Sequence, residues 1–134
     1  MQNAEILTME RYTLKESVIL EKSMNFSVRI VNMFKYLCNE QNEFVMSKQL
    51  LRSGTSIGAN ACEAHNAQSN KDFLAKMYIA YKESTETEYW LKLLAKTNYL
   101  PLKLSESILT DCVEIKKILT AIIKSVKSNS NKQK

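Results

Sequence analysis

Four lysines near the carboxyl end of the chain are the side chains whose chemistry stands out. From residue 116 onward the sequence carries six lysines and no acidic residue. On a helix, the seven-residue step between Lys117 and Lys124 places both on one face, and Lys116 and Lys127 lie beside them. Such a row favours contact with the phosphates of RNA or DNA, and the alternative is a solvated face that keeps the protein soluble. These lysines are candidate nucleic-acid contacts that include no base-reading or stacking group.

Residue types that support catalysis or metal binding are sparse. A di-iron bundle needs Glu-x-x-His motifs on two helices, whereas His65 is the single histidine. Cys62 lies three residues before it, but no second Cys/His pair completes a metal site. Glu83, Glu86 and Glu88 could form paired carboxylates, although an ion-paired or solvated helix face is the commoner role. The sequence therefore predicts a protein that is not an enzyme and has no cofactor or metal.

The stretch from Gln49 to Trp90 organises the rest of the chain. Its two halves each carry apolar or small residues at steps of three and four, which is the repeat of one helix face. Ser69 and Asp72 have the form of a capping box that starts a helix after the turn at 67–70. The stretch is thus predicted to be an antiparallel helical hairpin.

Gly54 and Gly58 lie inside the first helix of this hairpin. Each glycine costs roughly 1 kcal/mol relative to alanine in a helix interior, so helix propensity does not explain them. Their spacing of four instead makes a groove of small side chains in which a neighbouring helix can lie closely. A phosphate-binding loop is the competing interpretation, but no strand precedes the glycines and the loop lysine is missing.

The whole chain is predicted to be all-α. Two glycines and one proline in 134 residues are too few turn residues for a many-stranded fold, and 45% of the residues are hydrophobic. Helices are expected at about 17–40, 47–67, 70–97 and 105–126, with Ser47 and Ser105 as N-caps. Asn98 and Pro101 end the third helix.

These helices predict an antiparallel up-down-up-down four-helix bundle at 17–126. Residues 1–16 lack a clean apolar stripe and are expected to form a flexible or docked N-terminal arm. Residues 127–134 are expected to be a disordered basic tail. The apolar face of the fourth helix is wider than one bundle needs, which a subunit interface would explain.

The protein is predicted to be cytoplasmic, without a membrane partner. No stretch has the apolar length of a membrane span, and the amino terminus lacks a signal-peptide pattern. Cys38, Cys62 and Cys112 are odd in number and fall on separate predicted helices. Reduced packing cysteines are therefore expected.

Arg52 and Glu86 are predicted to form an ion pair across the hairpin. If the chain turns near residue 68, Arg52 lies level with residue 85, next to Glu86. The alternative leaves both side chains in solvent, since exposed pairs contribute only about 0 to 1 kcal/mol. Asn60 and Glu63, on the same helix as Arg52, could cap or bridge at a subunit contact.

Several of these residues also carry a family resemblance. The run from Gln49 to Asn60, followed by Glu63, the pair Asp72-Phe73 and the motif Glu86-x-x-Tyr89-Trp90-Leu91, closely resembles the four-helix-bundle proteins encoded in intervening sequences of bacterial large-subunit ribosomal RNA genes. Where many members have glycine after the glutamate of Asn-x-x-Glu, this chain has Ala64, so a tight backbone contact is not carried over to that position.

The resemblance implies a four-helix bundle that assembles as a homopentamer, with no established enzymatic activity. A related branch resembles the accessory protein of diversity-generating retroelements, a basic pentamer that binds the reverse transcriptase and nucleic acid. Two classes of function follow. The first is a non-catalytic oligomer that associates with RNA or DNA through the four lysines. The second is a protein-interaction scaffold that binds no nucleic acid.

Overall fold

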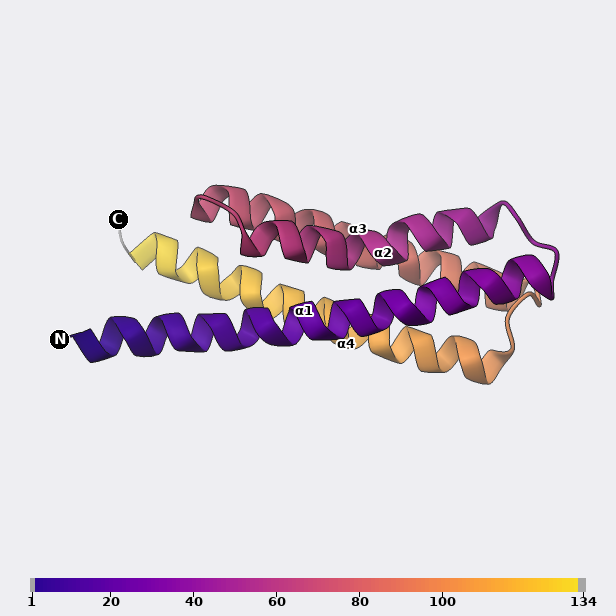
Figure 1. Ribbon diagram of the computed structural model, residues 1–134, viewed down its shortest axis with the longest axis horizontal. Coiled ribbons are helices and arrows are strands. Elements are labelled where there is room, and N and C mark those ends of the chain that lie inside the picture. Colours follow the sequence, from indigo (N-terminus) through magenta and orange to yellow (C-terminus); the bar gives the residue numbers. More distant parts are fainter. Residues whose placement is uncertain (1, 133–134) are drawn as a thin grey trace.

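Four helices make up the part of the chain that the structure describes. The computed structural model describes the backbone of residues 2–132 and the side chains of residues 17–129. The helices are α1 (Gln2–Asn39), α2 (Met46–His65), α3 (Asn70–Lys96) and α4 (Leu102–Lys132), and no strand occurs within the described backbone. Each helix runs back along the one before it, so that both ends of the chain lie at the same end of the bundle (Figure 1). Because α4 also packs against α1, the bundle is closed, and the predicted all-α four-helix bundle is confirmed.

The core is built from one apolar stripe on each helix. Large side chains with almost no exposure come from all four helices and form one cluster between them. The stripes follow the steps of three and four that bring side chains to a single helix face. The largest fully buried side chains include Phe26, Ile30, Leu37, Leu50, Ile57, Met77, Leu91, Ile108 and Leu119.

Both glycines of α2 face α1, and Gly54 is the one at which the two helices lie closest. A Cβ atom built at Gly54 would lie 2.8 Å from Cγ1 and Cγ2 of Ile30. A Cβ atom at Gly58 would lie 3.4 Å from the carbonyl oxygen and hydroxyl of Ser23 and from the hydroxyl of Ser27. The predicted groove of small residues is therefore present, and α1 is the helix that occupies it.

The helix caps agree only in part with the sequence. Ser69 caps α3 as predicted, since its side chain accepts a hydrogen bond from the Asp72 amide. The prediction of Ser47 as the cap of α2 is wrong, because the Glu43 carboxylate accepts hydrogen bonds from three amides at 45–47. The prediction of Ser105 as the cap of α4 is also wrong, because α4 begins at Leu102 and Ser105 is buried inside its first turn.

The outer helices are longer than their apolar stripes. The backbone of α1 is helical from Gln2, where a separate arm was expected at 1–16, and α4 continues through most of the expected tail to Lys132. An apolar stripe shows which part of a helix is packed against its neighbours, but it does not mark where the helix ends. Residues 2–16 and 127–132 include no glycine or proline, so nothing in them breaks the helical backbone. Docking of residues 1–16 on a neighbour stays a prediction, and residues 133–134 lie outside the described part of the chain.

None of the described helices combines the length and apolar character needed to cross a membrane. The three cysteines are free: Cys112 is buried, Cys38 is half-buried and Cys62 is exposed. Burial raises the pKa of the Cys112 thiol to about 12, so this group packs as a neutral side chain.

Candidate nucleic-acid interface

The four candidate lysines of α4 follow its border with α3. Lys117, Lys124 and Lys127 are exposed. Lys116 is half-buried: its Nζ lies 3.4 Å from Glu88 Oε1 and 5.2 Å from the centre of the Tyr81 ring. Lys116 therefore holds α4 against α3, and the other three side chains are the ones available to a partner.

Aromatic rings lie among these lysines, which the sequence analysis did not predict. Lys127 Nζ lies 4.9 Å from the centre of the Tyr78 ring. A groove of about 310 Å³ is lined by Tyr78 and Tyr81 from α3 together with Thr120, Ile123, Lys124 and Lys127 from α4. The signal was present in the sequence, because two tyrosines three residues apart follow the core residues Met77 and Ala80 and so lie at the edge of the buried stripe.

A second hollow along the same border has a mixed charge. It measures about 510 Å³, and its rim contains Lys92 and Lys117 together with Glu88 and Glu114. Carboxylates are therefore present at this end of the border, where they pair with Lys116 and Lys22, whereas the tyrosine-lined groove has none in its lining.

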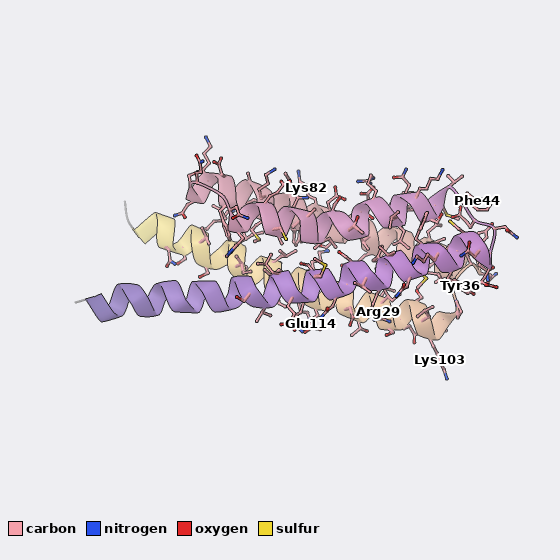
Figure 2. All side chains as sticks on the ribbon, viewed as in Figure 1. Arg29, Tyr36, Phe44, Lys82, Lys103 and Glu114 are labelled. Atoms are coloured by element: carbon pink, nitrogen blue, oxygen red, sulfur yellow. The ribbon has the colours of Figure 1, made fainter. Side chains whose placement is uncertain are left out.

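The border between α1 and α4 is also balanced in charge. Lys22 pairs with Glu114 at 2.6 Å, and Arg29 Nη1 pairs with Asp111 Oδ2 at 2.5 Å. Figure 2 shows Arg29 and Glu114 along this side of the bundle. The exposed lysines beside the tyrosines are thus distinguished by the absence of acidic side chains among the residues that line their groove.

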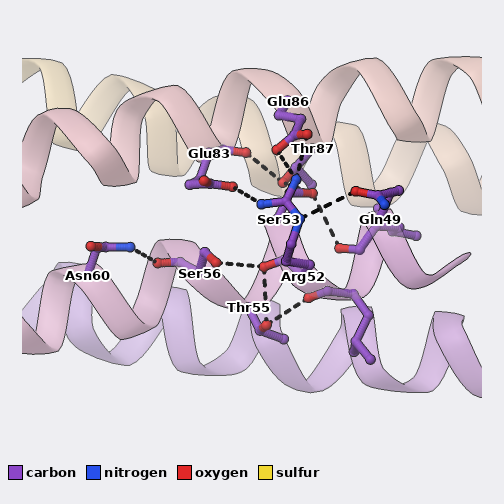
Figure 3. A network of polar contacts seen from close by, with 11 residues as sticks. Gln49, Arg52, Ser53, Thr55, Ser56, Asn60, Glu83, Glu86 and Thr87 are labelled. Carbon is purple, nitrogen blue, oxygen red and sulfur yellow. Dashed lines mark hydrogen bonds and ion pairs between the residues drawn. The ribbon is translucent and has the colours of Figure 1, made fainter. Parts of the chain in front are cut away.

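Arg52 joins α2 to α3 through two carboxylates (Figure 3). Its Nη2 lies 2.6 and 2.5 Å from the two carboxylate oxygens of Glu86, and its Nη1 lies 3.3 Å from Glu83 Oε2. The predicted ion pair is therefore present, and Glu83 and Gln49 extend it. The hydrogen bond from Arg52 lowers the pKa of Glu86, whereas burial raises the pKa of Glu83.

A buried pair of hydroxyl groups lies next to this network. Ser53 Oγ and Thr87 Oγ1 are 3.1 Å apart, and Thr87 Oγ1 is also 2.7 Å from the carbonyl oxygen of Glu83. Both residues are buried, so the pair satisfies polar groups inside the α2–α3 interface. The sequence analysis did not predict this pair.

Asn60 and Glu63 are both engaged within the chain. Asn60 Nδ2 donates a hydrogen bond to the carbonyl oxygen of Ser56 at 2.8 Å. Glu63 pairs with Lys76 of α3 at 2.7 Å. Their expected role at a subunit contact stays a prediction. Among the side chains that the structure describes, no group of three or more histidine, cysteine or acidic residues could hold a metal ion.

The fold and the α3–α4 border define a small four-helix-bundle protein with a lysine- and tyrosine-lined groove. The sequence matches the family model of the 23S rRNA-intervening sequence protein over residues 15–121, and the chain belongs to this family. The resemblance drawn from the sequence motifs is thus confirmed.

One solved structure is closely similar. It is a protein of unknown function from the S23 ribosomal protein family of Bacteroides thetaiotaomicron, with a crystal structure at 1.70 Å resolution. It is 59% identical to this chain, with a TM-score of 0.81, and the match covers 82% of this chain and 98% of that one. The sequence matches no curated protein.

Proposed function

We propose that this protein is a non-catalytic oligomer that associates with RNA or DNA in the cytoplasm through phosphates. The observation that carries the proposal is the set of exposed lysines on α4, of which Lys124 and Lys127 line a groove that has no acidic side chain in its lining. Lys117 continues the row toward the middle of the helix, where Glu88 and Glu114 lie beside it, and Lys116 is paired with Glu88. Phosphate contact of this kind is largely independent of sequence.

A structural role for the carboxylates supports the non-catalytic part of the proposal. Glu83 and Glu86 pair with Arg52, and Glu88 pairs with Lys116. These three residues are the glutamates of α3. Each of them joins α3 to a neighbouring helix by an ion pair, which accounts for its presence without a reaction.

Exposed apolar side chains on α1 support the oligomeric part. Met24 and Val28 are 60% and 54% exposed, one turn apart on the helix. Apolar side chains grouped on a surface mark protein–protein contacts. The proposed assembly is the homopentamer that the family resemblance implies, and it would repeat the lysine surface and strengthen binding to a polyanion by avidity.

The same α1 side chains favour the second candidate function. A protein-interaction scaffold would use Met24 and Val28 to bind a different protein, and the lysines would serve solubility. A reverse transcriptase is the partner that the retroelement branch of the resemblance suggests. The two functions differ in whether purified protein binds nucleic acid at all.

Binding across a salt series tests the proposal. Labelled structured RNA and duplex DNA are titrated with the wild type, with the triple variant Lys117→Gln, Lys124→Gln, Lys127→Gln, and with a control. The matched control changes the exposed lysines Lys48, Lys82 and Lys103 to glutamine, which removes the same charge elsewhere. Lys103 points away from the bundle near the start of α4, as Figure 2 shows.

The expected result is binding that weakens with salt and a triple variant that binds at least about tenfold more weakly. The slope of log affinity against log salt is negative, and each lost phosphate contact should make it shallower by about 0.7 to 0.9. An equal loss in the control would mean that only net charge matters. No binding to either polymer at low salt would refute the nucleic-acid role and favour the scaffold.

A further inference from the structure

The groove between Tyr78 and Lys124 combines an aromatic surface with ammonium groups. Tyr78 and Tyr81 are half-buried, so each ring is fixed by the bundle while part of it remains accessible. Lys124 and Lys127 are exposed and are three residues apart on α4, which brings their stems to about 5–6 Å at the Cβ atoms. Rigid rings and adjacent cations are the two components by which proteins bind single-stranded nucleic acid.

The two tyrosines differ in how firmly their lysines are held. Lys116, over the Tyr81 ring, is half-buried and paired with Glu88. Lys127, over the Tyr78 ring, is exposed. An exposed cation–π contact is weak, so Lys127 can exchange the ring for a phosphate oxygen. Tyr78 is therefore the ring that a ligand can uncover, and the lysine that leaves it is already positioned beside the ligand.

The size of the groove limits what can enter. Its volume of about 310 Å³ is at the lower end of the roughly 300–1,000 Å³ typical of ligand sites. This space suits one nucleotide unit and not the width of a double helix. None of the six side chains lining the groove is acidic, so a phosphate entering it meets only neutral groups and two cations.

We propose that this groove binds an unpaired nucleotide of single-stranded RNA or DNA, with the base stacked on Tyr78 and the flanking phosphates paired with Lys124 and Lys127. The inference rests on the proposed function and specifies its ligand. In a duplex the faces of the bases are covered by their neighbours, so only the phosphates are offered. A single strand offers both its base faces and its phosphates, so the groove should bind single strands in preference to duplexes.

The test compares labelled 12-nucleotide oligo-uridine and oligo-deoxythymidine with RNA and DNA duplexes of the same length, by fluorescence anisotropy at fixed salt. Two variants separate the ring from its hydroxyl: Tyr78→Leu removes the aromatic face, and Tyr78→Phe retains it. Circular dichroism of each variant reports whether the bundle is intact. Photocrosslinking of wild-type protein to 4-thiouridine-containing oligonucleotide, mapped by mass spectrometry, gives a readout that needs no variant.

The expected result is a preference for single strands of about tenfold or more at equal salt. Tyr78→Leu should lower single-strand affinity by about tenfold, the size expected for loss of one stacked base, and leave duplex affinity unchanged. Tyr78→Phe should bind as the wild type does, and crosslinks should map to Tyr78 or its neighbours in the groove.

Two outcomes would overturn the inference, and they differ in what they leave standing. If single strands and duplexes bind equally and crosslinks fall outside the groove, the stacking site is refuted while phosphate binding through α4 survives. If no polymer binds at low salt, the proposed function fails and the inference fails with it.

Discussion

Gly54 of α2 lies directly against the side chain of Ile30 on α1. A Cβ atom at Gly54 would be 2.8 Å from both γ carbons of Ile30, which is fully buried. Carbon atoms that are not bonded to each other pack at about 3.5–4.0 Å, so even a methyl group does not fit between the two helices here. The close approach of α1 and α2 therefore depends on the missing side chain.

Gly54→Ala should destabilise the bundle. The added methyl group overpacks the contact with Ile30, at a typical cost of about 1–3 kcal/mol, against a gain of up to about 1 kcal/mol in helix propensity. The net loss in the free energy of unfolding is measured by urea denaturation. Gly58→Ala is the matched control: its nearest neighbours would be 3.4 Å away, so it should be neutral or stabilise by up to about 1 kcal/mol.

The double variant Gly54→Ala, Ile30→Ala tests whether the clash with Ile30 is what makes Gly54→Ala destabilising. Ile30→Ala alone should cost about 2–5 kcal/mol through the cavity it leaves. In that background both clashing γ carbons are absent, so adding Gly54→Ala should be neutral or stabilising. An equal loss from Gly54→Ala in both backgrounds would show that Ile30 is not the obstacle.

The fold could be predicted because it depends on periodicity that is local in sequence. Apolar residues at steps of three and four identify the buried face of each helix, and the two glycines mark a face on which another helix can pack. The short connections make consecutive helices antiparallel neighbours. The cap of α2 could not be found in the same way. Glu43 lies in a connection with no pattern, and its role arises only when the chain folds back on the first turn of α2.

The candidate site was predicted in part for a similar reason. Lysine spacing on α4 marked a cationic face, but a side chain's neighbours across an interface depend on the register of two helices. Tyr78 and Lys127 are 49 positions apart, and only the packing of α3 against α4 brings them together. The same register decides that Lys116 pairs with Glu88 while Lys117, its neighbour, is exposed.

Glu43 should contribute to stability through the first turn of α2. Its carboxylate accepts hydrogen bonds from the amides of Val45, Met46 and Ser47, at 3.0, 2.9 and 2.7 Å. Glu43→Ala should cost about 1–3 kcal/mol, since three amides lose their acceptor and the hydrogen bond of the Ser47 amide is buried. Glu43→Gln keeps one carbonyl oxygen and should cost less. Urea denaturation at pH 7 gives both values, and equal stability of all three proteins would contradict the capping role.

The Glu43 contribution should also depend on pH. Burial by itself raises the pKa of this carboxyl, but the backbone hydrogen bonds outweigh it, and the pKa is lowered from 4.5. A carboxylate with a lowered folded-state pKa stabilises the protein above its unfolded pKa and loses this effect as the pH falls through the folded value. The difference between wild type and Glu43→Gln should therefore be largest at neutral pH and shrink below about pH 4.

Ser53 and Thr87 should act as a coupled pair. Ser53→Ala and Thr87→Val each remove one side of the 3.1 Å contact in a buried interface, so each should cost about 0.5–1.5 kcal/mol. The double variant removes both polar groups and leaves none without its partner. Its loss should be smaller than the sum of the single losses by about 0.5 kcal/mol or more in a double-mutant cycle. Strict additivity would show that the hydroxyls do not interact.

Glu83 and Glu86 both pair with Arg52, yet removing their charges should have different effects. The Arg52 hydrogen bond lowers the pKa of Glu86, so its ionised form stabilises the fold at neutral pH. Glu86→Gln should cost up to about 1 kcal/mol, a modest value because the pair is partly exposed. Burial raises the pKa of Glu83, so its ionised form is disfavoured in the folded state, and Glu83→Gln should be neutral or slightly stabilising at pH 7.

The pH dependence separates these two carboxylates further. As the pH falls through the folded-state pKa of Glu86, wild type should lose the stability that this group supplies, and Glu86→Gln should lack that part of the acid transition. Glu83 has the opposite effect on stability as the pH falls. Because its pKa is raised in the folded state, the folded protein takes up this proton at a higher pH than the unfolded chain does, and this offsets part of the stability lost in acid. Glu83→Gln should therefore lose stability more steeply than wild type as the pH falls toward the ordinary carboxyl pKa of 4.5, measured by urea denaturation at each pH. Identical curves for both variants would mean that burial of Glu83 does not outweigh its pairing with Arg52.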